Sequence, residues 1–286
     1  MKTKPISSRP ERIAPELLGE LDRVLQDNFI HYPDAMTALN ALRYARLYEA
    51  GRKRPMCIHI VGDPGMGKSF LLEYYWRNAS PITRDDDGRS TREIILIEAG
   101  ASGDWRDLAT RLGAACVPGW QPTRSTSLLS RVHSLLQMAG VKQILIDEVG
   151  NFLNGGPRMQ ATTLAFLKEL SNAGYTLAVA TPQSGRNVLA ADEQLSSRFR
   201  VLYLNHWTES ETLRQFLRAL EAELDLPVES RLYSQENVRW LMTNDLRSTT
   251  KIVKVIRRAA GLAIQRRRDH IDRELLEEAL SLIPTW

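Results

Sequence analysis

The chain has 286 residues, of which 43% are hydrophobic, and this length allows one large domain and a smaller one. Its apolar runs are short and its N-terminus has no apolar segment, so we expect neither a membrane span nor a signal peptide. The net charge of +4 permits contact with nucleic acid without requiring it. The two cysteines, Cys57 and Cys116, are too few for a disulfide framework. We therefore expect a cytoplasmic globular protein.

Two amphipathic helices are expected before the first strand. Apolar residues recur at helical spacing over residues 15–30 and again over 35–50, and Tyr32-Pro33-Asp34 separates the two stretches. Apolar helix faces usually pack on a core. A docking arm for a partner protein is the alternative interpretation of this region.

A glycine-rich loop lies between an apolar strand, Cys57–Val61, and a helical segment. Its sequence matches G-x-x-x-x-G-K-[ST], in which backbone N–H groups surround phosphate oxygens at the N-terminus of a helix. Lys68 is expected to reach the β- and γ-phosphates of a nucleoside triphosphate, and the Ser69 hydroxyl is expected to bind Mg²⁺. The predicted nucleotide contacts are Gly62, Asp63, Pro64, Gly65, Met66, Gly67, Lys68, Ser69 and Phe70.

The next predicted elements alternate between strand and helix. Ile94–Glu98 is a continuous apolar run that is typical of a parallel strand covered on both faces. Helices are expected over residues 104–115, with Asp104 as the N-cap, and over 125–138. The polar connection over residues 81–92 contains three consecutive aspartates. We interpret it as a solvated loop, because no further metal ligands lie at a usable spacing.

Two carboxylates end the following strand. The apolar run Gln143–Ile146 leads directly into Asp147 and Glu148. In a chain with a phosphate-binding loop, Asp147 is expected to bind Mg²⁺, and Glu148 is expected to polarise the water that attacks the γ-phosphate. The two acids therefore predict that the protein hydrolyses the nucleoside triphosphate as well as binding it.

The remaining pattern completes an α/β domain and adds a helical region. A helix over residues 159–173 precedes a strand, 175–180, which ends at Thr181, a residue placed to sense the γ-phosphate or orient the water. Residues 185–197 are expected to be helical, and 201–204 to form the last strand. Strands alternating with helices predict a doubly wound parallel sheet with ligands at the carboxyl ends of its strands. Further helices are expected over 209–224, from residue 237, and from Asn244 through Arg267.

The order of these motifs resembles the AAA+ ATPases, and more narrowly the TniB and TnsC transposition regulators. The narrower resemblance rests on Ile146–Leu153, Ala180-Thr181, Asp192–Phe199 and the C-terminal helices from Leu226 to Asp272, and it covers about residues 35–284. It implies an AAA+ core with a five-stranded parallel sheet between helices and a small, all-helical lid. The expected domains are an N-terminal extension over 1–55, the nucleotide-binding core over 56–206 and the lid over 207–286.

Further site residues are assigned through this resemblance. Arg198 occupies the Ser-Arg-Phe position that supplies an arginine finger to the nucleotide of the neighbouring subunit, and Arg200 is the adjacent candidate. Thr181 matches the first sensor, although Pro182 departs from the commoner residue at the next position. Arg247 is similar to the second sensor of AAA+ lids, or else belongs to a basic helix face. Sequence-nonspecific DNA contacts are implied for Arg106, Arg111, Arg124 and Thr126.

The resemblance implies an ATP- and Mg²⁺-dependent regulator of transposition. Such a protein would assemble on duplex DNA as a ring or filament and would present the target to a DDE transposase together with a target-selection protein. Hydrolysis would then drive its disassembly. One alternative is an initiator or helicase-loader type of AAA+ ATPase. Another is a nucleotide-dependent switch or scaffold with little turnover, against which the presence of Glu148 argues.

Overall fold

A computed structural model of the protein describes residues 15–79, 82–84, 90–122 and 127–282. Its centre is a five-stranded sheet in the order β4-β5-β6-β1-β7, with all neighbouring strands parallel. The strands are β1 (Cys57–Gly62), β4 (Ile94–Glu98), β5 (Gln143–Asp147), β6 (Thr176–Thr181) and β7 (Phe199–Leu204). The predicted α/β fold with five parallel strands is confirmed.

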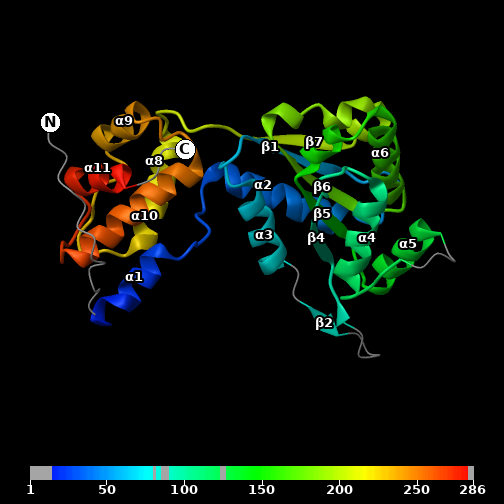
Figure 1. Cartoon of the computed structure of the whole chain (residues 1–286), viewed down its shortest axis with the longest axis horizontal. Helices are drawn as coiled ribbons and strands as arrows, with labels where there is room; N and C mark the ends of the chain where they lie inside the picture. Colours follow the sequence, from blue (N-terminus) through cyan, green and yellow to red (C-terminus); the bar gives the residue numbers. More distant parts are fainter. Residues whose placement is uncertain (1–14, 80–81, 85–89, 123–126, 283–286) are drawn as a thin grey trace. The chain divides into compact units, whose positions relative to one another are not determined.

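Helices cover both faces of this sheet (Figure 1). One face carries α4 (Trp105–Cys116), α5 (Leu128–Met138) and α6 (Pro157–Asn172), whose apolar side chains form the main core with those of the strands. The other face carries α2 (Pro33–Tyr44) and α3 (Lys68–Ala79). Every residue of β1 and β6 is buried, as expected for strands between two helical layers.

The strand order determines which residues meet at the carboxyl edge of the sheet, where the parallel strands end. Because β6 lies between β1 and β5, its last residue, Thr181, is next to Val61 in register and near the end of β5. The loop after Gly62, the end of β6 and the Asp147–Glu148 pair therefore share one edge.

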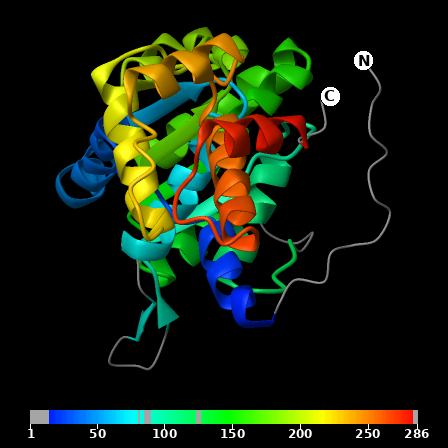
Figure 2. The same cartoon turned by 90° about the vertical axis from the view of Figure 1, so that its left-hand side faces the viewer.

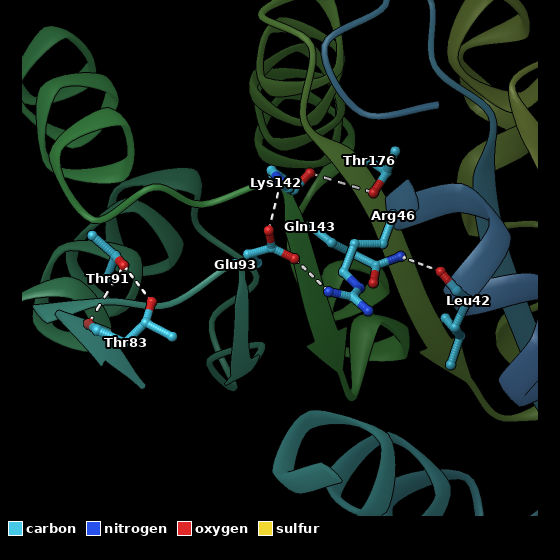
Figure 3. A network of polar contacts seen from close by, with 8 residues as sticks. All are labelled: Leu42, Arg46, Thr83, Thr91, Glu93, Lys142, Gln143 and Thr176. Carbon is cyan, nitrogen blue, oxygen red and sulfur yellow. Dashed lines mark hydrogen bonds and ion pairs between the residues drawn. The ribbon is translucent and has the colours of Figure 1, made fainter. Parts of the chain in front are cut away.

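The amino edge, where the strands begin, is held to α2 by polar contacts (Figure 3). α2 continues into a π-helical turn, η2 (Ala45–Glu49), and Arg46 of this turn pairs with Glu93. Lys142 Nζ approaches the other oxygen of Glu93 at 2.5 Å. Gln143, which is fully buried, donates from Nε2 to the carbonyl of Leu42 at 3.1 Å. The prediction that this apolar helix packs on the core is confirmed for residues 33–49.

A short hairpin lies within the segment that we predicted to be a polar loop. β2 (Thr83–Arg84) pairs antiparallel with β3 (Ser90–Thr91), and the hydroxyls of Thr83 and Thr91 are 2.8 Å apart (Figure 3). The three consecutive aspartates lie outside the described residues.

The chain divides into two compact units, one of residues 31–206 and one that joins residues 1–30 to 207–286. The described helices of the second unit are α1 (Leu18–Leu25), α8 (Glu211–Leu224), α9 (Gln235–Thr243), α10 (Thr249–Gln265) and α11 (Arg273–Ser281), with a short 3-10 turn, η1 (Pro15–Leu17), before α1. The C-terminal helical region is thus present as predicted, and α1 lies beside α10 (Figures 1 and 2). This grouping differs from the predicted division at residue 55.

Hydrogen bonds and ion pairs attach the N-terminal helix to the C-terminal ones. Arg257 of α10 is only 6% exposed and lies 3.5 Å from both Asp27 Oδ1 and the carbonyl oxygen of Asn28. Burial lowers the pKa of this guanidinium, while Asp27 acts to raise it. Arg23 of α1 also pairs with Asp225 at 2.5 Å. A charge this deeply buried needs its partners, so the segment directly after α1 is held to the helical unit.

Several predicted helices differ from the structure. Asn244 does not begin the long helix, because Asp245 has a φ of 55° and Ser248 caps the helix by accepting from the backbone N–H of Lys251. Residues 185–197 form no single helix: the turns η4 (Gln183–Gly185), η5 (Val188–Ala191) and α7 (Glu193–Ser196) lie there instead, and β7 begins two residues before the predicted strand. Over the described ranges, no helix combines the length and apolar character needed to cross a membrane.

Candidate nucleotide-binding site

The loop between β1 and α3 has the backbone geometry that its glycines predict. Gly65 and Gly67 have φ values of 80° and 88°, a region that other residues rarely adopt. A Cβ on Gly62 would lie 2.7 Å from the carbonyl oxygen of Leu204, so only glycine fits where β1 ends beside β7. A Cβ on Gly67 would meet nothing within 4 Å, so its positive φ, and not crowding, is what favours glycine there.

Lys68 is the first residue of α3, and its side chain folds over the loop. Its Nζ donates to the carbonyl oxygens of Gly62 at 2.6 Å and Asp63 at 3.2 Å. Burial lowers the pKa of Lys68, whereas the carboxylates of Asp147, Glu148 and Asp63 act to raise it. The predicted phosphate-binding lysine and the two strand-end acids are therefore close enough to interact electrostatically.

The two acids adopt a distinctive backbone geometry. Asp147, the last residue of β5, accepts a hydrogen bond at Oδ1 from the backbone N–H of Glu148 at 2.8 Å. Glu148 is exposed and has a φ of 58°, a left-handed conformation that costs a non-glycine residue on the order of 1–3 kcal/mol and is found preferentially at functional sites. Glu148 is thus open to solvent, whereas Asp147 is only partly exposed.

Close packing joins the turns that follow β5 and β6. The 3-10 helix η3 (Val149–Asn154) begins directly after Glu148. A Cβ on Gly150 would lie 2.9 Å from Pro182 Cδ, and a Cβ on Gly185 would lie 3.4 Å from both Gly150 Cα and Thr181 Cβ. The glycines therefore allow the two turns to meet, and this contact limits how far Glu148 can move relative to Thr181.

Thr181 is fully buried at the end of β6, and its hydroxyl has a partner that the sequence motifs did not identify. His59 Nε2 of β1 lies 2.8 Å from Thr181 Oγ1, and the imidazole also packs edge-on against Phe199, with ring centroids 6.4 Å apart. Burial lowers the pKa of His59 to about 4. The signal for this residue was a histidine in an otherwise apolar strand.

A second histidine missed by the motifs contacts the loop itself. His206 Nε2 lies 2.9 Å from Asp63 Oδ2, so the segment after β7 is attached to the phosphate-binding loop. Nothing in the local sequence around His206 marks this contact, because the two residues are brought together only by the pairing of β1 with β7.

Arg198 lies at the opposite, amino edge of the sheet. Its carbonyl accepts from the backbone N–H of Cys57, the first residue of β1. Its guanidinium donates to Ser171 Oγ at 2.9 Å and to Asn172 Oδ1 at 2.8 Å. Arg198 is therefore not part of the site formed by its own loop.

The other predicted residues are distributed over both units. Arg247 belongs to the helical unit, where it is exposed and its Nε lies 3.5 Å from Asp245 Oδ1. On α4, the Arg106 guanidinium lies over the Trp105 ring at 5.0 Å, and Arg111 pairs with Asp107 at 3.0 Å. Arg124 and Thr126 lie outside the described residues.

Hydrogen bonds link the turn after the acids to the loop before α4. Asn151 and Asn154 of η3 donate from Nδ2 to the carbonyls of Ala99 at 3.2 Å and Ala101 at 3.3 Å. Thr163 of α6 donates to the carbonyl of Gly103 at 2.7 Å. The approach to α4 is thus fixed by side chains from two other elements.

The donor set suits a magnesium–nucleotide complex. The Ser69 hydroxyl is exposed and the Asp147 carboxylate is partly exposed, while the described residues contain no cluster of three or more metal-binding side chains. Mg²⁺ typically uses one or two protein oxygens and takes its remaining ligands from phosphates and water. The residues present therefore fit the cation if it arrives with the nucleotide.

Comparisons with known proteins agree with this geometry. The family model described as "Bacterial TniB protein" matches residues 20–209. Among solved structures, the Aeropyrum pernix ORC2 protein (ADPNP–ADP complexes) is 18% identical, with 92% of this chain and 72% of that chain covered at a TM-score of 0.64. The Aeropyrum pernix ORC1 protein in complex with DNA is 17% identical, with 91% and 68% covered at a TM-score of 0.60.

A bacterial initiator gives a similar result over nearly its whole chain. Domain III of the Thermotoga maritima replication initiation protein DnaA is 18% identical, with 94% of this chain and 98% of that chain covered at a TM-score of 0.54. No curated protein matches significantly. At these identities the solved structures establish the fold, and the family model covers about two thirds of the 286 residues. The chain belongs to the bacterial TniB family and has the fold of an AAA+ ATPase.

Proposed function

We propose that this protein is an ATP-hydrolysing, DNA-binding regulator of transposition that assembles into a ring or filament on duplex DNA. The proposal rests on one observation: the loop, Lys68 and the Asp147–Glu148 pair lie together at one edge of the sheet. The chain that carries them belongs to the TniB family. A lysine among phosphate-binding amides serves nucleotide binding, and an exposed glutamate beside it supports hydrolysis.

Each residue at the carboxyl edge has a separate task in this proposal. Lys68 exchanges the carbonyls of Gly62 and Asp63 for the phosphate oxygens. Ser69 and Asp147 would hold Mg²⁺, which would neutralise phosphate charge. Glu148 accepts the proton of the attacking water. Arg247, in the helical unit, is proposed as a second sensor.

Arg198 is proposed to act on the nucleotide of a neighbouring subunit. β1 and β7 run parallel with Cys57 opposite Phe199 and Gly62 opposite Leu204. At about 3.3 Å per residue, the loop lies about 17 Å from the start of β7, which directly follows Arg198. This separation excludes a contact in the same subunit. Hydrolysis then requires assembly, because a guanidinium must be brought to the transferring phosphoryl group by another copy.

DNA binding is proposed for the exposed face of α4. Arg106 and Arg111 are exposed there, and contacts to phosphates would make binding independent of sequence and strongly dependent on salt. The solved neighbour in complex with DNA has the same fold. Target DNA held in this way would be presented to a DDE transposase, together with a target-selection protein. The alternative of an initiator or helicase loader is supported only by the fold that the chain shares with the solved neighbours.

The test is the ATPase rate as a function of protein concentration, with and without duplex DNA. We expect a rate that rises more steeply than protein concentration, increases with DNA, and falls about 100-fold or more in Arg198→Ala while ATP still binds. Arg200→Ala tests the adjacent candidate in the same assay, since Arg200 is exposed and lies in β7 two residues after Arg198. A rate proportional to protein, insensitive to DNA and to Arg198, would leave a self-contained nucleotide switch.

A further inference from the structure

His59 is an unexplained polar residue in the most apolar part of the sheet. All six residues of β1 are buried, and His59 itself is 2% exposed. A buried polar group is costly unless it is hydrogen-bonded. The hydrogen bond to Thr181 Oγ1 at 2.8 Å meets this requirement. Each of the two buried side chains therefore supplies the hydrogen-bond partner that the other needs.

The sheet register brings these two side chains together. β1 and β6 are parallel, with Val61 opposite Thr181 and His59 opposite Val179. Side chains two residues apart on a strand point to the same face, so His59 and Thr181 are diagonal neighbours on one face. A Cβ added at Gly185 would lie 3.4 Å from Thr181 Cβ, so the turn after β6 packs closely on this threonine.

We propose that His59 is a positioning residue for ATP hydrolysis, donating Nε2–H to Thr181 Oγ1 so that the threonine hydroxyl keeps its own proton for the γ-phosphate or the attacking water. The inference rests on the proposed function, in which Thr181 acts as the first sensor. A neutral imidazole has one N–H and one bare nitrogen. Only the Nε2–H tautomer leaves the Thr181 proton available, because the other tautomer would accept that proton.

The environment of the ring keeps this arrangement constant at physiological pH. Burial lowers the pKa of His59 to about 4, so the imidazole is neutral near pH 7. Phe199, which follows Arg198, makes an edge-type ring contact with the imidazole. The imidazole that faces Thr181 therefore keeps the same protonation state near pH 7.

The experiment is a double-mutant cycle with His59→Phe, Thr181→Val and the double variant in the full-length protein. The readouts are single-turnover hydrolysis at saturating ATP, ATP affinity and the free energy of unfolding. We expect each single variant to hydrolyse ATP about 10-fold more slowly or worse, with affinity changed less than about threefold. The double variant should be no slower than Thr181→Val, because without the hydroxyl there is nothing left for His59 to orient.

Two further variants separate positioning from packing. His59→Gln keeps an N–H donor at a similar reach and should restore most of the rate lost in His59→Phe, which also provides a test if the phenylalanine variant does not fold. Cys57→Ala is the matched control: Cys57 is buried on the same face of the same strand, and its thiol lies near Ser171. It should alter stability without altering the hydrolysis rate.

The outcomes that overturn the inference are specific. Equal slowing by His59→Phe in the wild-type and Thr181→Val backgrounds would show that His59 does not act through Thr181. Full activity of His59→Phe alongside a slow Thr181→Val would refute positioning while leaving the sensor intact. Full activity of Thr181→Val would instead refute the sensor role in the proposed function, and the inference with it.

Discussion

Burial of His59 should make the stability of the sheet-containing unit depend on pH, and one substitution should remove this dependence. The folded protein binds the His59 proton with a pKa of about 4, against an ordinary value of 6.5. As pH falls below 6.5, the unfolded chain takes up this proton and the folded chain does not. Stability is therefore lost between about pH 6.5 and 4, and is fully present above that window.

The size of the effect follows from the shift. One pKa unit corresponds to about 1.4 kcal/mol, so a shift from 6.5 to about 4 gives an upper bound near 3 kcal/mol at pH 4. About 2 kcal/mol of this should already be lost at pH 5. His59→Gln retains a hydrogen-bond donor but does not titrate, so it should lack this contribution.

The assay is urea unfolding of the wild type and of His59→Gln at a series of pH values from 7.5 to 4.5. The pKa values of Glu93, Asp192 and Asp272 are also lowered in the folded protein, but these acids contribute equally to both proteins. The difference between the two free energies of unfolding therefore reports the contribution of His59 alone. Between pH 7 and 5, the wild type should lose about 2 kcal/mol more stability than the variant. A difference that does not change with pH would refute the burial argument.

Three other substitutions test separate parts of the structure. Glu148→Gln should keep ATP affinity and slow hydrolysis about 100-fold or more, measured by phosphate release, because it removes the proposed base. Glu93→Gln leaves the mostly buried Arg46 guanidinium without its counter-charge, so urea unfolding should show a loss of about 1–3 kcal/mol at unchanged ATP affinity. Gly150→Ala places a Cβ 2.9 Å from Pro182 Cδ and should destabilise by about 1–3 kcal/mol and slow hydrolysis; wild-type values in both measurements would contradict the tight packing of these turns.

The phosphate-binding loop and the acids were predictable because their chemistry is encoded locally. Three glycines, a lysine and a hydroxyl within eight residues specify a backbone path and its ligand. An apolar run ending in two acids likewise specifies a buried strand with carboxylates at its end. The parallel sheet followed from the alternation of strands and helices, and the structure confirmed it.

What the sequence did not predict depends on residues that are distant along the chain. His59 and Thr181 meet only because β6 pairs with β1, 122 positions apart. The grouping of the first helix with the C-terminal ones also joins distant residues, such as Arg257 and Asp27, which are 230 positions apart. The helix start predicted at Asn244 failed for a local reason, since Asp245 adopts a positive φ that propensity does not reveal.

The two edges of the sheet explain why the proposed activity would depend on assembly. The carboxyl edge holds the loop and the acids, whereas Arg198 lies at the amino edge, where Ser171 and Asn172 hold its guanidinium. A parallel sheet cannot bring its two edges together within one subunit, since the strands keep them apart at a fixed distance. Two copies can do so when the amino edge of one meets the carboxyl edge of the next. Such a head-to-tail contact builds rings or filaments, so the same geometry that separates Arg198 from its own nucleotide also accounts for the proposed oligomer.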